Sequence, residues 1–147
     1  GGKRGRIAAI LLLIATGLAD AVAAQIIKPA AGRLRPCHAL ETVRLLGHCG
    51  GKYGFVSNHA ANMFASMTVL ALFYHRFRWY FWSIATLIAY SRIYVGVHYP
   101  GDVIGGALFG IGMASLWFGL LILMNNYLRK REKPWLEWRD PPPALGQ

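Results

Sequence analysis

Four long apolar stretches, separated by short polar or basic segments, set the pattern of the chain. The first covers 7–27, and Asp20 and Gln25 are its only strongly polar members. At about 1.5 Å per residue, a helix of this length crosses the roughly 30 Å hydrocarbon core of a bilayer. Three further apolar runs follow at 60–74, 79–97 and 103–127. The pattern predicts an all-α fold, an integral membrane bundle of four transmembrane helices.

The segments between and after these stretches complete the predicted organisation. Residues 1–128 form one transmembrane domain, and its long polar segment at 28–58 forms a single loop. Residues 129–147 are basic and end in a proline-rich sequence, so we expect a solvated tail. A cleaved signal peptide is the alternative for the first stretch, because three cations precede it. The stretch is longer than a typical signal-peptide core, which favours a spanning helix.

The basic residues predict the orientation of the bundle. The sequence carries 16 Lys and Arg and a formal net charge of +10. With four spans, ten of these cations share the side of both termini, and cytoplasmic segments are where Lys and Arg concentrate. The opposite side has six, which are Lys28, Arg33, Arg35, Arg44, Lys52 and Arg92. We therefore expect cytoplasmic termini and tail, an extracytoplasmic 28–58 loop, and a bacterial inner membrane as the location.

The same placement accounts for the high positive charge. Cations beside membrane boundaries are attracted to anionic lipid, so the lipid bilayer is the expected partner. Nucleic acid, which also binds basic surfaces, is not. No oligomeric state is predicted.

A first polar cluster follows the first apolar stretch. Lys28 ends the predicted helix, and a short loop can bring Arg35 back beside it. Arg binds phosphate oxygens with a planar fork, while Lys acts as a compact point charge. The alternative is a pair of interfacial anchors that extend toward lipid head groups.

A second cluster, Ser57-Asn58-His59, precedes the second apolar run. Ser57 or Asn58 can therefore cap the helix, which places His59 in the first turn. Free N–H groups at a helix N-terminus make a ready site for an anion. Plain capping beside an interfacial histidine is the alternative.

The third cluster lies around the last helix boundary. Arg92 falls inside an apolar helix, where a charge needs a partner or an aqueous cavity. His98 and Asp102 are four residues apart across Pro100-Gly101. Asp102 can fix the tautomer of the imidazole and leave its other nitrogen free to attack. A capping aspartate with a surface histidine is the alternative.

All three clusters fall on one predicted side of the membrane, which independent anchors would not require. Their spacing resembles that of the type 2 phosphatidic acid phosphatase superfamily. The matching residues are Lys28, then after six residues Arg35-Pro36, then Ser57-Asn58-His59, then Ser91-Arg92, His98 and Asp102. The chain departs from the usual Pro-Ser-Gly-His of the second motif, with Val56 for the proline and Asn58 for the glycine.

The resemblance implies a mechanism and roles for these residues. His98 is the expected nucleophile that forms a phosphohistidine, Asp102 orients it, and His59 protonates the leaving oxygen. The expected phosphate-binding residues are Lys28, Arg35, Ser57, Asn58 and Arg92. No metal or other cofactor is expected. Membrane members of the family commonly have six spanning helices, so the four found here are either a reduced form or the last four of a six-helix core.

The substrate expected from this placement is a lipid phosphate whose tail stays in the bilayer. Our first choice is undecaprenyl (polyprenyl) diphosphate. Phosphatidylglycerol phosphate, phosphatidic acid and lipid A phosphates are alternatives, and so are a lipid phosphotransferase and a non-enzymatic protein that binds anionic lipid. A vanadate-dependent haloperoxidase has a similar anion site, but those relatives are soluble, and four spanning helices argue against one.

Three further expectations concern the loop and the first helix. Cys37 and Cys49 both lie in the loop, where an oxidising compartment favours a disulfide over two free thiols. Within the same loop, 40–46 is a candidate short helix. Asp20 lies in a spanning helix, so we expect it to face the bundle and pair with a polar group of another helix, in a structural role.

Overall fold

The computed structural model describes residues 2–131, and within that range it is helical without a β-strand. The helices are α1 (Lys3–Val22), α2 (Lys28–Ala31), α3 (Pro36–Ala39), α4 (Asn58–Phe73), α5 (Arg78–Tyr94) and α6 (Pro100–Lys130). The expectation of an all-α fold is confirmed for the described residues. The part of the expected tail that begins at 132 lies outside them, while 129–130 continue α6.

The first apolar stretch forms part of a longer continuous helix. A π-helical segment, Ala23–Ile27, joins α1 to α2, so the helical run extends from Lys3 to Ala31. Gly32 ends the run in the left-handed conformation, with φ at 58°. This residue therefore turns the chain away from the helix axis at the point where the polar loop begins.

Two of the helices are long and apolar enough to cross a membrane. They are the run Lys3–Ala31, of 29 residues, and Pro100–Lys130, of 31 residues. Only 28% and 17% of their most apolar windows are buried, so most of this apolar surface faces outward. The other two predicted spans form shorter helices, since α4 has 16 residues and α5 has 17.

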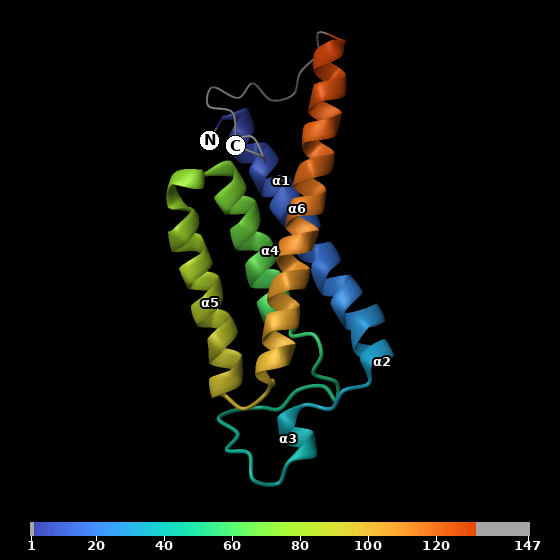
Figure 1. The fold of residues 1–147 in the computed structure, drawn as a ribbon, viewed down its shortest axis with the longest axis vertical. Helices are drawn as coiled ribbons and strands as arrows, with labels where there is room; N and C mark the ends of the chain where they lie inside the picture. Colours follow the sequence, from blue (N-terminus) through green and yellow to red (C-terminus); the bar gives the residue numbers. More distant parts are fainter. Residues whose placement is uncertain (1, 132–147) are drawn as a thin grey trace.

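The four helices of the bundle place their polar ends together. In Figure 1, α4 lies in the middle of the bundle, and it contacts α1, α5 and α6. The α2 end of the first helix, the start of α4, the end of α5 and the start of α6 all lie at the lower end of that view, with the loop and α3 below them. The start of α1 and the end of α6 lie at the opposite end. The three polar clusters therefore meet at one end of the molecule.

Glycines allow α4 and α6 to pack closely. A Cβ atom at Gly106 would lie 2.6 Å from the Ser57 carbonyl oxygen, and one at Gly110 would overlap the Ala61 carbonyl. Farther along the same helices, the rings of Phe73 and Phe118 meet edge to face, with centroids 5.5 Å apart. Small residues near the start of α4 and aromatic residues near its end thus fix the contact between α4 and α6.

The polar loop is mostly irregular. The short helix expected at 40–46 is wrong, because those residues form a turn at 41–42 and otherwise no regular secondary structure. The loop helix is instead α3, which begins at Pro36, where a proline lacking an N–H is well accommodated. Leu46 donates its N–H to the carbonyl of Val95 at 3.1 Å, which fastens the loop to the end of α5.

Candidate active site

The two cations of the first cluster meet at one backbone carbonyl. Lys28 Nζ and Arg35 Nε each donate to the Tyr53 oxygen, at 3.4 Å in both cases. A β-bridge between Leu34 and Tyr53 brings the two ends of the loop together. It is flanked by backbone hydrogen bonds from Arg35 N to the Lys52 oxygen (3.2 Å) and from Gly54 N to the Arg33 oxygen (2.8 Å). The returning end of the loop therefore positions both cations.

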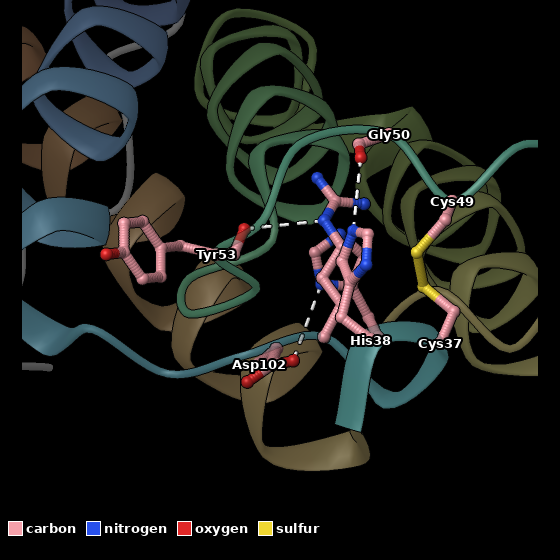
Figure 2. The surroundings of a disulfide bond; sticks show 8 residues. Cys37, His38, Cys49, Gly50, Tyr53 and Asp102 are labelled. Atoms are coloured by element: carbon pink, nitrogen blue, oxygen red, sulfur yellow. Dashed lines mark hydrogen bonds and ion pairs between the residues drawn. A yellow bond between two sulfur atoms is a disulfide. The ribbon is translucent and has the colours of Figure 1, made fainter. Parts of the chain in front are cut away.

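A disulfide closes the loop beside Arg35. Cys37 and Cys49 are bonded to each other, as expected from the sequence. Figure 2 shows the bond with His38 pointing toward the Gly50 carbonyl, at 3.3 Å from the ring Nε2. A Cβ at Gly50 would lie 3.6 Å from an Arg35 guanidinium nitrogen, so the loop backbone runs directly against that side chain.

The second cluster begins α4, with Ser57 as its N-cap. Its hydroxyl oxygen accepts from Ala60 N at 3.5 Å, and its own N–H donates to the Asp102 carbonyl at 2.9 Å. Ser57 is fully buried, while His59 in the first turn is exposed. The cap thus joins the starts of α4 and α6 and leaves His59 accessible.

Asn58, which stands where the family usually has glycine, is bonded toward α1. Its side-chain amide donates to Asp20 Oδ1 at 2.8 Å, and the amide of Asn62 donates to the same oxygen at 2.8 Å. Asp20 therefore meets polar groups of another helix, as expected. Its structural role stays a prediction.

The third cluster places a buried carboxylate beside a buried imidazole. His98 Nδ1 lies 3.4 Å from Asp102 Oδ2, and the two residues are 3% and 0% exposed. The same oxygen accepts from Tyr99 N at 3.0 Å, which completes the cap of α6. Burial lowers the pKa of His98 to about 4, and the charges of Arg35 and Lys28 act in the same direction, while Asp102 opposes them. The imidazole is therefore neutral at pH 7, as a nucleophile requires.

Two arginines differ from their expected places. Arg92 donates from Nε to the Ser91 hydroxyl oxygen at 3.1 Å, and it does not line the cavity described next. Arg33, which the sequence places only among the loop cations, lies 3.2 Å from Asp102 Oδ1. Nothing in the spacing of the motifs distinguishes Arg33, because it falls within the six residues that separate Lys28 from Arg35.

A cavity of about 380 Å³ joins the clusters. Its lining residues are Ala24, Lys28, Pro29, Arg35, Gly51, Lys52, Tyr53, Asn58, His59 and His98. Five predicted site residues thus share one cavity, while the lining omits Ser57, Arg92 and the fully buried Asp102. Lys52 and Tyr53 are lining residues that sequence reasoning did not assign to the site.

The chemistry of the lining suits an anion. Three cationic side chains and two imidazoles face the cavity, and no carboxylate of residues 2–131 lines it. Carboxylate oxygens are what a magnesium site would need, so these residues do not form one. Outside the cavity, Cys37, His38 and Cys49 place potential ligand atoms within 4.8 Å of one another. Both sulfurs are joined in the disulfide, so thiolate ligation there would require reduction.

The fold and the site together define a helical bundle with cations, two imidazoles and a buried carboxylate at one end, an arrangement whose charge suits an anion. The model of the PAP2 superfamily matches residues 8–127, and the chain belongs to that superfamily. The resemblance drawn from the motifs, to the type 2 phosphatidic acid phosphatases, is thereby confirmed.

Several curated relatives carry phosphatase names. A lipid A 4'-phosphatase of Porphyromonas gingivalis is 36% identical over 68% of this chain and 45% of its own length. A lipid A 1-phosphatase of Rhizobium etli is 33% identical over 74% of this chain and 47% of its own. An undecaprenyl-diphosphatase of Sulfolobus acidocaldarius is 36% identical, over 78% and 55%. The chain thus spans about half the length of these relatives. No solved structure matches it.

Proposed function

We propose that this protein is a lipid phosphatase that works without a metal, through a phosphohistidine at His98. The observation that carries the proposal is the neutral, buried imidazole, which has a carboxylate behind it and a cationic cavity in front. Membership of the superfamily supports the same reaction class.

The proposed reaction has two steps. In the first, His98 Nε2 attacks phosphorus, the bond to the leaving oxygen breaks, and His59 in its imidazolium form gives that oxygen a proton. In the second, water attacks the phosphorus, the bond to Nε2 breaks, the neutral His59 takes a proton from the water, and phosphate leaves. Cations that concentrate positive charge around the phosphoryl oxygens stabilise both transition states. Lys28, Arg35 and Asn58 line the cavity and are proposed to hold those oxygens. Ser57 and Arg92 do not line it, and their proposed part in phosphate binding rests on the family resemblance alone.

We propose further that the reaction occurs at a membrane surface. The outward apolar surface of the two longest helices supports this placement, and so does α5, whose exposed side chains include Trp79, Leu87 and Tyr94. Such a surface on a soluble monomer would be unusual. Four spanning helices, cytoplasmic termini and an extracytoplasmic site complete the proposed arrangement.

For the substrate, we keep a polyprenyl diphosphate as the first candidate. Its charged head group fits a cavity with three cations, and its tail can remain in the lipid beside the helices. A lipid A phosphate is the second candidate, because relatives from two genera bear the names lipid A 4'-phosphatase and lipid A 1-phosphatase.

The test is phosphate release in detergent with EDTA present. Undecaprenyl diphosphate, lipid A, phosphatidylglycerol phosphate and phosphatidic acid serve as substrates, and His98→Ala is compared with the parent. His48→Ala is the matched control, because His48 is an exposed histidine of the 28–58 loop and does not line the cavity. We expect His98→Ala to abolish release and His48→Ala to retain it. Release that survives in His98→Ala would contradict the proposal, and transfer to an added alcohol acceptor instead of water would identify a phosphotransferase.

A further inference from the structure

Arg33 makes three contacts that together fix its position. Its Nη1 lies 3.2 Å from Asp102 Oδ1, and its guanidinium carbon lies 4.5 Å from the centre of the Tyr99 ring. Its backbone oxygen accepts from Gly54 N at 2.8 Å. An exposed arginine without such contacts would sample many rotamers. Here the backbone, the aromatic ring and the carboxylate all limit the side chain.

Its partner, Asp102, is the residue behind the nucleophile. Asp102 is fully buried, and its Oδ2 is already in contact with His98 Nδ1 and Tyr99 N. Arg33 meets the other oxygen, Oδ1. A buried carboxylate is costly unless a counter-charge or hydrogen bonds compensate it. Because His98 is neutral at pH 7, the cation that balances Asp102 at contact distance is Arg33.

We propose that Arg33 is a positioning residue of the reaction, which acts on His98 through Asp102. It holds the carboxylate so that Oδ2 faces the imidazole, and it shares the negative charge that would otherwise attract a proton to His98. The inference rests on the proposed function, in which His98 is the nucleophile.

The local backbone explains how Arg33 reaches this place. Gly32 adopts φ at 58° and turns the chain at the end of α2, so the next side chain points toward the start of α6. Gly54 lies on the other side of the carboxylate, where a Cβ would come 3.0 Å from Asp102 Oδ2. The loop thus contributes a cation on one side of Asp102 and close backbone on the other.

Arginine suits the role better than lysine. A planar guanidinium can lie over a ring and still direct an N–H toward a carboxylate, whereas an ammonium has no plane to stack. We therefore expect Arg33→Lys to keep the charge and lose part of the alignment. Arg33→Gln and Arg33→Met remove the charge altogether.

The other charges near His98 remain in these variants. Those that act on the pKa of His98 are Asp102 on α6, Lys28 on α2 and Arg35 in the loop, and Lys52 and the titratable His59 of α4 line the same cavity. With Arg33 neutral, the undivided charge of Asp102 favours the imidazolium, so protonation of His98 moves to higher pH. Because Arg33 is partly exposed, solvent screens it, and we expect a shift of about one pH unit.

The test follows the acid limb of kcat/KM in Arg33→Gln, Arg33→Met, Arg33→Lys and the parent. The matched control is Arg44→Gln, which removes an exposed loop cation. We expect the limb to move to higher pH in both neutral variants and to stay in place in Arg33→Lys and Arg44→Gln. We also expect kcat at pH 7 to fall about tenfold in the neutral variants, with KM changed less, because Arg33 does not line the cavity.

A second readout does not depend on turnover. Diethyl pyrocarbonate modifies neutral imidazole, so the rate at which it modifies His98 falls when His98 becomes protonated. The rate is measured from pH 4 to 7 by mass spectrometry of the peptide that contains His98. A shift of this pH profile to higher pH in Arg33→Gln and Arg33→Met supports the inference. A profile equal to that of Arg44→Gln overturns it. A parent that releases no phosphate would contradict the proposed function, and the modification profile would still decide the role of Arg33.

Discussion

At the scale of single residues, the site depends on opposed charges that act on one imidazole. Burial, Arg35 and Lys28 disfavour the imidazolium of His98, while Asp102 favours it. The first three prevail, so the pKa of His98 lies below its usual value and the imidazolium form is disfavoured at pH 7. In the proposed reaction a phosphoryl group on Nε2 makes the imidazole cationic, and Asp102 lies 3.4 Å from Nδ1, where it can stabilise that charge.

The pH dependence of the reaction follows from this balance. Since the pKa of His98 is lowered from 6.5 to about 4, this imidazole, the proposed nucleophile, stays neutral as pH falls through 6.5. We expect no loss of kcat/KM from protonation of His98 between pH 7 and 5. As pH falls through about 4, His98 becomes protonated, and we expect kcat/KM to be lost. The measurement is phosphate release from a lipid phosphate in detergent across this range. If the acid limb instead lay near pH 6.5 and moved in Asp102→Asn, burial would not be what controls the pKa of His98.

At the scale of elements, the contact between α4 and α6 positions the site. Ser57 N donates to the Asp102 carbonyl, and Gly106 and Gly110 bring the two helices close enough for that bond. A side chain in this contact would therefore disturb both the packing and the relation of His59 to His98.

The glycine contact gives a stability prediction. In Gly110→Ala the added methyl would overlap the Ala61 carbonyl, so the helices must separate, and we expect a loss of about 1–3 kcal/mol. Gly112→Ala is the control on the same helix, because nothing lies within 4 Å of its added Cβ. There, the better helix propensity of alanine should leave stability equal or slightly higher. Thermal unfolding in detergent compares the two, and equal melting of both variants would refute the packing argument.

The disulfide gives a second prediction for an element. The bond closes the loop between Cys37 and Cys49, and that loop backbone runs against Arg35. We expect Cys37→Ser/Cys49→Ser to lower stability by about 3 kcal/mol, from the entropy of the open loop. We also expect KM for the lipid phosphate to rise more than kcat falls, because Arg35 binds phosphate in the proposed function. Steady-state kinetics of the parent with and without reductant provide the comparison. Identical KM values would show that the disulfide does not affect substrate binding at the site.

The sequence predicted the elements better than the contacts between them. Each of the four apolar runs begins and ends within four residues of a helix or helical run, because length and apolar content limit where a helix can lie. The loop could not be derived in this way. Its path depends on one β-bridge and on backbone groups such as the Tyr53 carbonyl, which leave no trace in side-chain composition. Arg33 was missed for the same reason, since its role comes from a turn at Gly32.

At the scale of the whole molecule, the helix ends and the loop that carry the predicted catalytic and phosphate-binding residues lie at one end of the bundle (Figure 1). The connection between α4 and α5, with its basic residues Arg76 and Arg78, lies at the other end. If the bundle spans the membrane as proposed, these two ends face different compartments.

Labelling with a membrane-impermeant maleimide tests that arrangement. In a background with serine at both native cysteines, we introduce His48→Cys in the loop or Arg76→Cys between α4 and α5, both at exposed positions. In intact cells we expect label on the first variant, and on the second only after lysis. The reverse pattern would invert the orientation, and label on both in sealed cells would contradict a spanning bundle.

The Tyr53 carbonyl holds Lys28 and Arg35 through contacts of 3.4 Å each. It is a neutral acceptor, and both bonds are long, so an incoming phosphate dianion can outcompete it for the two cations. The carbonyl therefore keeps two like charges near the cavity, and it is an uncharged partner that a phosphate can replace. Because this acceptor is a main-chain atom, a substitution of the Tyr53 side chain leaves it in place, and we expect such a variant to keep Lys28 and Arg35 together beside the cavity.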